Sequence, residues 1–140
     1  MSTIFTRIIS GELPGRFVWR DELCVAFLSI NPLRPGHTLV VPRAEVDHWI
    51  DLPAETNSHL MRVAHEIGAA QMAAFSPTRI GLIIAGMEVP HVHLHVVPIT
   101  AERDLNFANA DLTPDAAALD DATDRIRAGL RARGASQVSD

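Results

Sequence analysis

The chain is organised around Val89-Pro90-His91-Val92-His93-Leu94-His95-Val96-Val97-Pro98, a segment with three histidines at alternate positions of an apolar run. Because successive side chains of a strand point to opposite faces, we expect the three imidazoles on one face and the intervening apolar residues on the other. One histidine in a core is ordinary, but three on one face leave several ring nitrogens to satisfy. Imidazole titrates near neutral pH, so such a row can share nucleophile, acid and donor roles, and we interpret it as a catalytic site.

The sequence on both sides of this segment predicts an α+β fold. A strand over residues 79–85 precedes it, and the short link from Gly86 to Pro90 implies antiparallel pairing. Apolar periodicity and turn residues indicate further strands over 17–20, 23–30 and 37–41, and helices over 4–9, 53–75 and near 114–133. We therefore expect an antiparallel sheet of about five strands with a long helix, a short N-terminal helix and a C-terminal helix.

Composition and charge narrow the class of protein. The 140 residues, 47% of them hydrophobic, suit one domain. The net charge is −5, and the twelve basic residues are all arginines without a dense basic block, which disfavours a nucleic-acid polymer as partner. The absence of lysine excludes Schiff-base catalysis. No signal-peptide or membrane-span pattern occurs, so we expect a soluble, cytoplasmic protein that does not bind a membrane.

The single cysteine and three other histidines carry less weight. Cys24 lies in an apolar stretch, so we expect no internal disulfide and a buried, unreactive thiol. His48, His59 and His65 belong to no shared helical face or motif, and we expect them to be solvated and without a functional role.

The segment from His91 to Val97 resembles the signature of the histidine triad (HIT) superfamily of nucleotide hydrolases and transferases, His-x-His-x-His-x-x with apolar x. The similarity extends to Ile4-Phe5 with Ile8-Ile9-Ser10-Gly11-Glu12-Leu13-Pro14, and to the stretches 26–32 and 35–42. It covers roughly residues 3–98 and is strongest to the small bacterial HIT-like branch without a structural zinc site. We therefore interpret residues 1–100 as a HIT-like domain and 101–140 as a C-terminal extension of the same globular unit.

The resemblance implies a mechanism. His93 would attack the α-phosphorus of a purine nucleotide conjugate and form a covalent nucleotidyl-histidine that water hydrolyses. His91 would fix the tautomer and orientation of His93, and His95 would donate to a phosphate oxygen. His37 aligns with a further histidine that supports this cluster from the neighbouring strand. The implied substrates are phosphoramidates, adenylylated compounds or dinucleoside polyphosphates.

The resemblance also implies a nucleotide-binding surface. Ser29 stands where relatives often place an aspartate on the ribose, which would weaken or alter ribose recognition. Glu88 lies in a shortened stretch where relatives commonly carry asparagine and Gly-Gln-Ser, and its carboxylate would protonate a leaving group, repel a phosphate or be solvated. Apolar and aromatic residues that equally suit an ordinary core would line a base pocket: Ile4, Phe5, Ile8, Phe27, Ile30 and Leu39.

Many relatives bind structural zinc through a Cys-x-x-Cys pair near the start and a histidine after the central strands. Here Thr3, Thr6 and Glu45 stand at those positions. Hydroxyls and one carboxylate are a poor zinc set, so we expect neither a structural metal nor a cofactor. The resemblance further implies a homodimer.

Two other functions stay open at this point. Loss of the asparagine and serine donors favours a nucleotide-binding module with little catalytic power. Neutral histidines are also common metal ligands, so the row would suit a metal enzyme, although Glu88 is the one carboxylate close to it in sequence.

Overall fold

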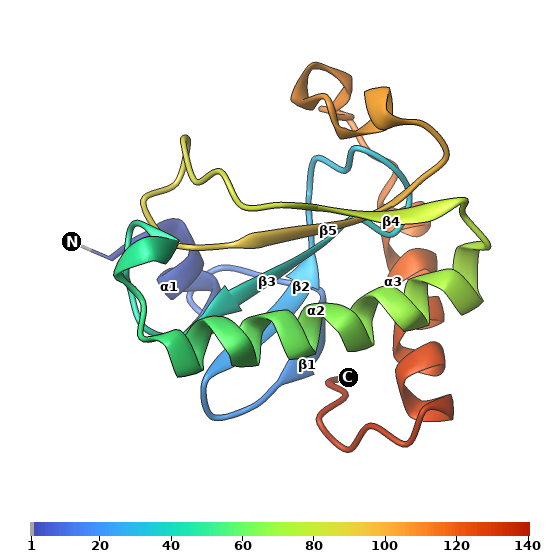
Figure 1. The fold of residues 1–140 in the computed structure, drawn as a ribbon. Coiled ribbons are helices and arrows are strands. Elements are labelled where there is room, and N and C mark those ends of the chain that lie inside the picture. The colour runs from blue at the N-terminus through green and yellow to red at the C-terminus, as the bar shows by residue number, and fades with distance from the viewer. Residues whose placement is uncertain (1) are drawn as a thin grey trace.

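The computed structural model describes residues 2–140, which form one antiparallel sheet flanked by three α-helices (Figure 1). The strand order is β1-β2-β3-β5-β4, and every neighbouring pair is antiparallel. This confirms the predicted α+β fold with five strands. The elements, in chain order, are α1 (Ile4–Ile9), β1 (Phe17–Arg20), β2 (Cys24–Leu28), β3 (Thr38–Pro42), the 3₁₀ turn η1 (Trp49–Asp51), α2 (Ala54–Phe75), β4 (Arg79–Ile83), β5 (Leu94–Ile99), the 3₁₀ turns η2 (Glu102–Leu105) and η3 (Phe107–Asn109), and α3 (Ala116–Ala132).

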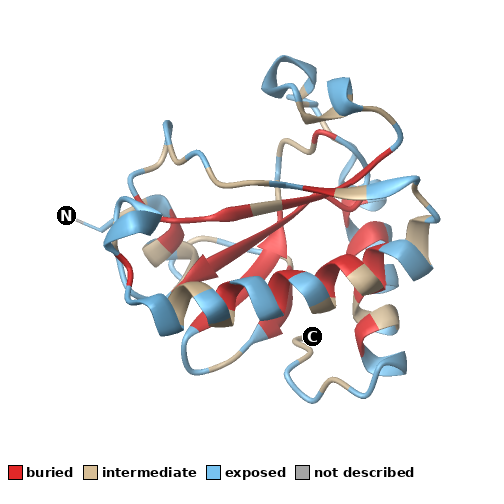
Figure 2. Cartoon of the chain, viewed as in Figure 1, coloured by how far each residue is buried: buried red, intermediate tan, exposed pale blue. Residues whose placement is uncertain are grey.

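The central strands are buried on both faces, and alternate residues enter two different cores (Figure 2). In β2, Ala26 and Leu28 pack with α2, whereas Val25 and Phe27 pack with α1. In β5, Leu94 joins the core under α2, so the alternation places its neighbours in sequence on the α1 side. The α1 side of the sheet is therefore the face that carries the histidines.

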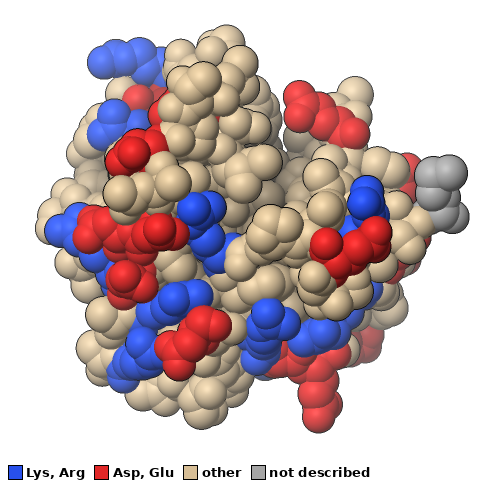
Figure 3. Space-filling view, turned by 180° about the vertical axis from the view of Figure 1, so that it is seen from behind, with Lys and Arg blue, Asp and Glu red and all other residues tan. Residues whose placement is uncertain are grey.

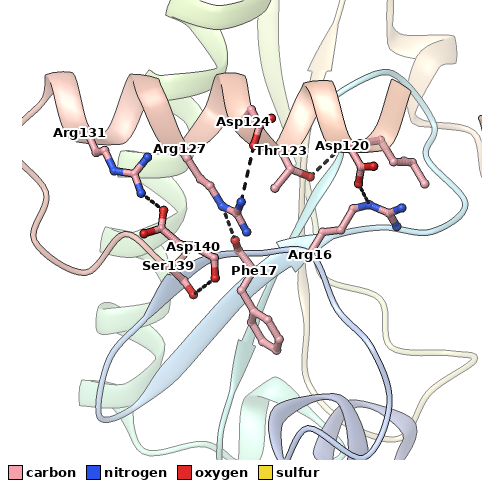
Figure 4. A network of polar contacts seen from close by, with 10 residues as sticks. Arg16, Phe17, Asp120, Thr123, Asp124, Arg127, Arg131, Ser139 and Asp140 are labelled. Carbon is pink, nitrogen blue, oxygen red and sulfur yellow. Dashed lines mark hydrogen bonds and ion pairs between the residues drawn. The ribbon is translucent and has the colours of Figure 1, made fainter. Parts of the chain in front are cut away.

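The C-terminal helix α3 packs against α2 and completes the larger core. Asp115 caps it by accepting a hydrogen bond from the Ala118 amide, and Gly134 follows its end at φ +81°. Polar contacts also tie it to β1, where Arg127 Nε donates to the Phe17 carbonyl at 2.9 Å (Figure 4). The apolar stripe of α3 that enters the core consists of Leu119, Ala122, Ile126 and Leu130.

The histidine segment is only partly a strand, which corrects our expectation for its whole length. β5 begins at Leu94, opposite Val40 of β3. Continuing this register would place Val92 opposite Pro42, which has no N–H to donate to a ladder. The Val92 amide instead donates to the carbonyl of Val46 at 2.8 Å. The paired part of β5 thus begins just after the second histidine of the motif, and Pro42 prevents the ladder from extending back to Val92.

The surface gives no sign of a large basic patch on the face turned away in Figure 1. Arginine and acidic side chains are interspersed there (Figure 3). Within the described residues, no helix combines the length and apolar character that a membrane span requires.

Candidate active site

The fold brings three histidines together on the α1 side of the sheet. His95 lies in β5, in register with Leu39 on one neighbouring strand and Ile83 on the other. The ring centroid of His93, one residue before the strand, is 4.8 Å from that of His95. His37 precedes β3, and its Nε2 lies 2.9 Å from His95 Nδ1. Two chain segments that are distant in sequence therefore build one imidazole cluster.

The backbone fixes the tautomer of His93. Its Nδ1 lies 2.7 Å from the His91 carbonyl oxygen, which can only accept, so Nδ1 carries the proton and Nε2 keeps its lone pair. His93 Nε2 has no hydrogen-bond partner within residues 2–140. Among these residues, the one side-chain nitrogen or oxygen that is both buried and without a partner is Gln71 Oε1, so His93 Nε2 is not a buried atom. Nε2 therefore reaches solvent although His93 as a whole is only 6% exposed. Burial lowers the pKa of His93, which keeps the ring neutral and nucleophilic.

A second backbone group fixes the His37–His95 pair. The Leu33 amide donates to His37 Nδ1 at 3.0 Å, so His37 carries its proton on Nε2 and donates it to His95 Nδ1. His95 in turn holds its own proton on Nε2. Burial, with a smaller effect of the neighbouring imidazoles, lowers the pKa of His37 to about 3 and that of His95 to about 4. At neutral pH, His95 is therefore an uncharged hydrogen-bond donor with a fixed orientation.

The side chain of His91 turns away from the other two histidines of the motif. It is fully buried, with Nε2 donating to the Pro42 carbonyl at 2.8 Å and Nδ1 accepting from Thr3 Oγ1 at 2.7 Å. The part of His91 that meets His93 is its carbonyl oxygen. The resemblance implied that the His91 ring orients the His93 ring. In the structure, the group of His91 that holds the His93 ring is the backbone carbonyl.

Hydrogen bonds close the corner where many relatives hold zinc. Glu45 Oε1 accepts from the Thr3 amide at 2.6 Å and from Thr6 Oγ1 at 2.7 Å, and the Thr3 hydroxyl points to His91. The backbone hydrogen bond from Thr3 is the main reason that the pKa of Glu45 is lowered. Two hydroxyls engaged in this way do not fit the thiolate-rich donor set of a structural zinc site.

Most of the residues expected at a base pocket lie in one apolar cluster beside the histidines. The Phe5 ring meets His93 edge-on at 4.9 Å between centroids and contacts Phe27 at 5.7 Å. Leu39 belongs to the same buried cluster, and Ile8 packs against it. Ile4 and Ile30 are instead 45% and 64% exposed. We call the buried apolar surface formed by Phe5, Phe27 and Leu39 the apolar floor. The two exposed aliphatic side chains lie outside it.

The two polar residues expected at the nucleotide site lie in exposed or half-buried positions. Ser29 Oγ accepts from the Asn31 amide at 3.3 Å, just beyond β2. Glu88 is exposed in the loop before the motif, and its charge acts to raise the pKa of His93, although burial outweighs this effect. Both residues therefore flank the cluster without a contact that fixes a role.

Sequence reasoning missed two residues that contact the cluster or its backbone. The Phe107 ring lies 5.0 Å from the His95 ring, in a segment whose sequence carries no catalytic motif. Gln71 of α2 is buried and donates through Nε2 to the carbonyls of Gly36 and Val96, the neighbours of His37 and His95. A polar residue on the apolar stripe of α2 is the signal that could have revealed Gln71.

His59 corrects our expectation that it is solvated. Its Nε2 lies 2.7 Å from Asp21 Oδ2, which also accepts from Trp19 Nε1 at 2.8 Å. The potential ligand atoms of Asp21, Cys24 and His59 lie within 4.8 Å of one another. Among residues 2–140, these three residues form the group with metal-ligand spacing, and the histidine row does not. Burial acts to raise the pKa of Asp21, but the several hydrogen bonds that its carboxylate accepts outweigh burial and lower the pKa to about 2, so this carboxylate fits a structural anchor between β1 and α2. His48 and His65 are exposed, as expected.

Two cavities of the molecule lie away from the histidine cluster. One of about 420 Å³ adjoins Asp21, His59 and the chain after α3, and one of about 260 Å³ lies between residues 32–36 and the start of α3. Neither of these two cavities is lined by the histidines of the cluster.

Comparison with known proteins gives one consistent result. Residues 10–102 match the sequence model of the HIT domain. An uncharacterized HIT-like protein of Borreliella burgdorferi is 38% identical over 102 residues, which cover 68% of this chain and 73% of that protein. The adenylylsulfatase HINT3 of Arabidopsis thaliana is 28% identical over 122 residues, covering 84% of this chain and 61% of that protein.

A solved structure agrees over almost the whole length. The crystal structure of a zinc-bound histidine triad family protein from Mycobacterium smegmatis superposes with a TM-score of 0.83 at 29% identity. The match covers 96% of each chain, so it extends into the C-terminal region beyond the family-model match to residues 10–102.

Proposed function

The chain belongs to the HIT domain family, and from this premise we propose that it cleaves purine nucleotide conjugates at the α-phosphate through a covalent nucleotidyl-histidine. The observation that carries the proposal is the pairing of an unprotonated His93 Nε2, open to solvent, with a fixed donor on His95. A lone pair and an N–H that border the same surface are what attack on phosphorus requires.

In the first step, His93 Nε2 forms a bond to the α-phosphorus with its lone pair. The bond from phosphorus to the leaving group breaks, and its electron pair stays on the leaving atom. A phosphate or sulfate departs as the anion, whereas an amine takes a proton from solvent. The Nε2–H of His95 donates to a non-bridging phosphoryl oxygen and stabilises its growing charge.

In the second step, water attacks the phosphorus of the nucleotidyl-histidine. The nitrogen–phosphorus bond breaks, its electron pair returns to His93 Nε2, and the water proton passes to solvent. The Nδ1–H of His93 stays on the His91 carbonyl throughout, so the same tautomer is ready for the next cycle. Transfer to another acceptor follows the same path with an alcohol or amine in place of water.

The apolar floor beside His93 supports a purine nucleoside as the invariant part of the substrate. Phe5, Phe27 and Leu39 offer flat apolar surface, and exposed Ile4 and Ile30 would close on a bound base. Ser29, just beyond β2, would contact the ribose, and as a neutral hydroxyl it would bind ribose more weakly than a carboxylate. The name of the Arabidopsis relative favours adenylylated compounds among the three substrate classes.

A nucleotide-binding module with little turnover is the second candidate. Glu88 favours it, because this carboxylate is exposed and makes no hydrogen bond within residues 2–140 that would hold it in place to protonate a basic leaving group. The proposal also includes a homodimer in the cytoplasm. Light scattering of the purified protein tests the dimer.

Replacing the nucleophile separates these candidates. We expect His93→Ala to abolish hydrolysis of adenosine 5′-phosphosulfate and adenosine 5′-phosphoramidate while circular dichroism stays unchanged. His65→Ala, an exposed histidine on α2, is the matched control and keeps wild-type turnover. Nucleotide binding without product release by the wild-type protein would support the binding module instead, and turnover by His93→Ala would exclude His93 as nucleophile.

A further inference from the structure

Phe107 lies at the His95 end of the histidine cluster, whereas Phe5 of the apolar floor contacts His93. Its ring meets His95 at 5.0 Å between centroids and 65° between planes, whereas Phe5 meets His93 and His91. Phe107 nevertheless keeps 46% of its surface exposed. The histidine row is thus bordered by a buried aromatic ring at one end and a half-exposed one at the other.

The backbone around Phe107 is firmly held. Asn106 accepts a hydrogen bond from the Ala108 amide at 2.9 Å, and Asn109 Nδ2 donates to the Arg103 carbonyl at 2.7 Å. Asp104 accepts from the amides of Thr100 and Ala101, which joins the segment to the end of β5. A ring that is exposed but carried by an anchored backbone is a preformed surface rather than a loose side chain.

The second anchor lies on the loop before β3. The Asp111 amide donates to the Pro32 carbonyl at 3.0 Å, and Asn31 Nδ2 donates to the Asp111 carbonyl at 3.1 Å. Leu105 packs on the small core of Leu33, Val97 and Ile99. The segment that carries Phe107 is therefore tied to β5, which carries His95, and to the loop that leads to His37.

We propose that Phe107 forms a leaving-group subsite that takes a flat, aromatic substituent. The inference rests on the proposed function: the nucleoside occupies the apolar floor at the Phe5 end, so the group expelled from phosphorus lies toward the His95 end. The exposed surface of Phe107 is then the apolar surface nearest to that group. Aromatic rings pack on one another more favourably than their buried area alone predicts.

Two matched probes test the subsite. The adenosine 5′-phosphoramidates of 2-phenylethylamine and 2-cyclohexylethylamine present an aromatic or a saturated six-membered ring on the same linker. We expect wild-type kcat/KM to favour the aromatic probe by about three- to tenfold, the range of an aromatic pair. Phe107→Leu, which keeps an apolar side chain, should remove this preference with a smaller effect on the saturated probe.

Leu112→Ala is the control, because Leu112 is 76% exposed in the same C-terminal region. It should keep the wild-type preference. An equal loss on both probes in Phe107→Leu would mean that Phe107 only shields His95, and a preference that survives in Phe107→Leu would place the aromatic contact elsewhere. Either result overturns the subsite but leaves the proposed function standing, whereas absence of turnover on both probes by the wild-type protein counts against the function itself.

Discussion

The two ends of the histidine row are built in opposite ways. At the closed end, His91 is fully buried and its ring nitrogens are satisfied by Pro42 and Thr3. At the open end, His95 Nε2 has no hydrogen-bond partner within residues 2–140, and the ring is bordered by Phe107, which is half exposed. In the proposed function, the same residue type in one motif therefore serves as scaffold at one end and as a donor to substrate at the other. What separates the two roles is the partner of each ring nitrogen.

His93 lies between the two ends and contacts both of them. Its Nδ1 is held by the carbonyl of the closed-end histidine, and its Nε2 faces the surface that it shares with the open end. Backbone groups set the proton positions of His37 and His93, and the His37 ring sets that of His95, so the cluster is arranged before any substrate arrives. Changes at the open end should therefore lower the rate, and changes at the closed end should first lower stability.

The largest effect is expected at the open end. His95→Gln keeps a polar side chain but loses the fixed Nε2–H, so kcat should fall by about 10²- to 10³-fold, the usual cost of removing one preorganised donor. KM should change much less, because the donor acts on charge that develops in the transition state. Steady-state kinetics on adenosine 5′-phosphosulfate measure both constants. A fall confined to KM would instead make His95 a ground-state binding residue.

A smaller effect is expected at the closed end. Thr3→Val leaves the buried His91 Nδ1 without its donor and removes the hydroxyl that caps α1, at a cost of about 1–3 kcal/mol in the free energy of unfolding. Urea unfolding measures this loss. Thr3→Ser keeps the hydroxyl and serves as the control. If Thr3→Val leaves stability unchanged but lowers kcat as strongly as His95→Gln does, the two ends do not differ in the way described.

The smallest effect concerns pH. Burial lowers the pKa of His93 below its usual 6.5, so the nucleophile is mostly unprotonated at pH 6.5 and above. We therefore expect kcat/KM to fall by less than about twofold when the pH is lowered from 8 to 6.5. The larger fall should occur below pH 6.5, where His93 becomes protonated. A pH–rate profile of the wild-type protein measures this. An acidic limb with an apparent pKa of 7 or more would show that the His93 imidazole is not shielded in the free protein.

The fold was predictable because its signals are local. Alternating apolar residues, the proline that ends β3 and the stripe of α3 each act over a few neighbouring positions, and the predicted element order matches the structure. The strand limits were less accurate, because the end of pairing at Leu94 depends on Pro42 across the sheet, which a pattern within residues 89–98 does not contain.

The arrangement of the site depended on contacts between distant residues. Thr3 lies 88 positions from His91, and His59 lies 38 positions from Asp21, so neither hydrogen bond leaves a local signal. Phe107 follows the motif in a stretch of 3₁₀ turns without periodicity. The alternating pattern identified the three histidines of the motif and the family resemblance added His37, but which ring nitrogen is left free on His93 and His95 follows only from the hydrogen bonds around them.

The central claim is that the bare Nε2 of His93 bonds to phosphorus. Rapid acid-free quenching of the wild-type protein with adenosine 5′-phosphosulfate, followed by mass spectrometry of its peptides, tests this directly. We predict an added adenylyl group on the peptide that contains His93, absent from His93→Ala and longer-lived in His95→Gln. Sustained turnover with no adduct in either the wild-type protein or His95→Gln, or an adduct on a different residue, would contradict the account.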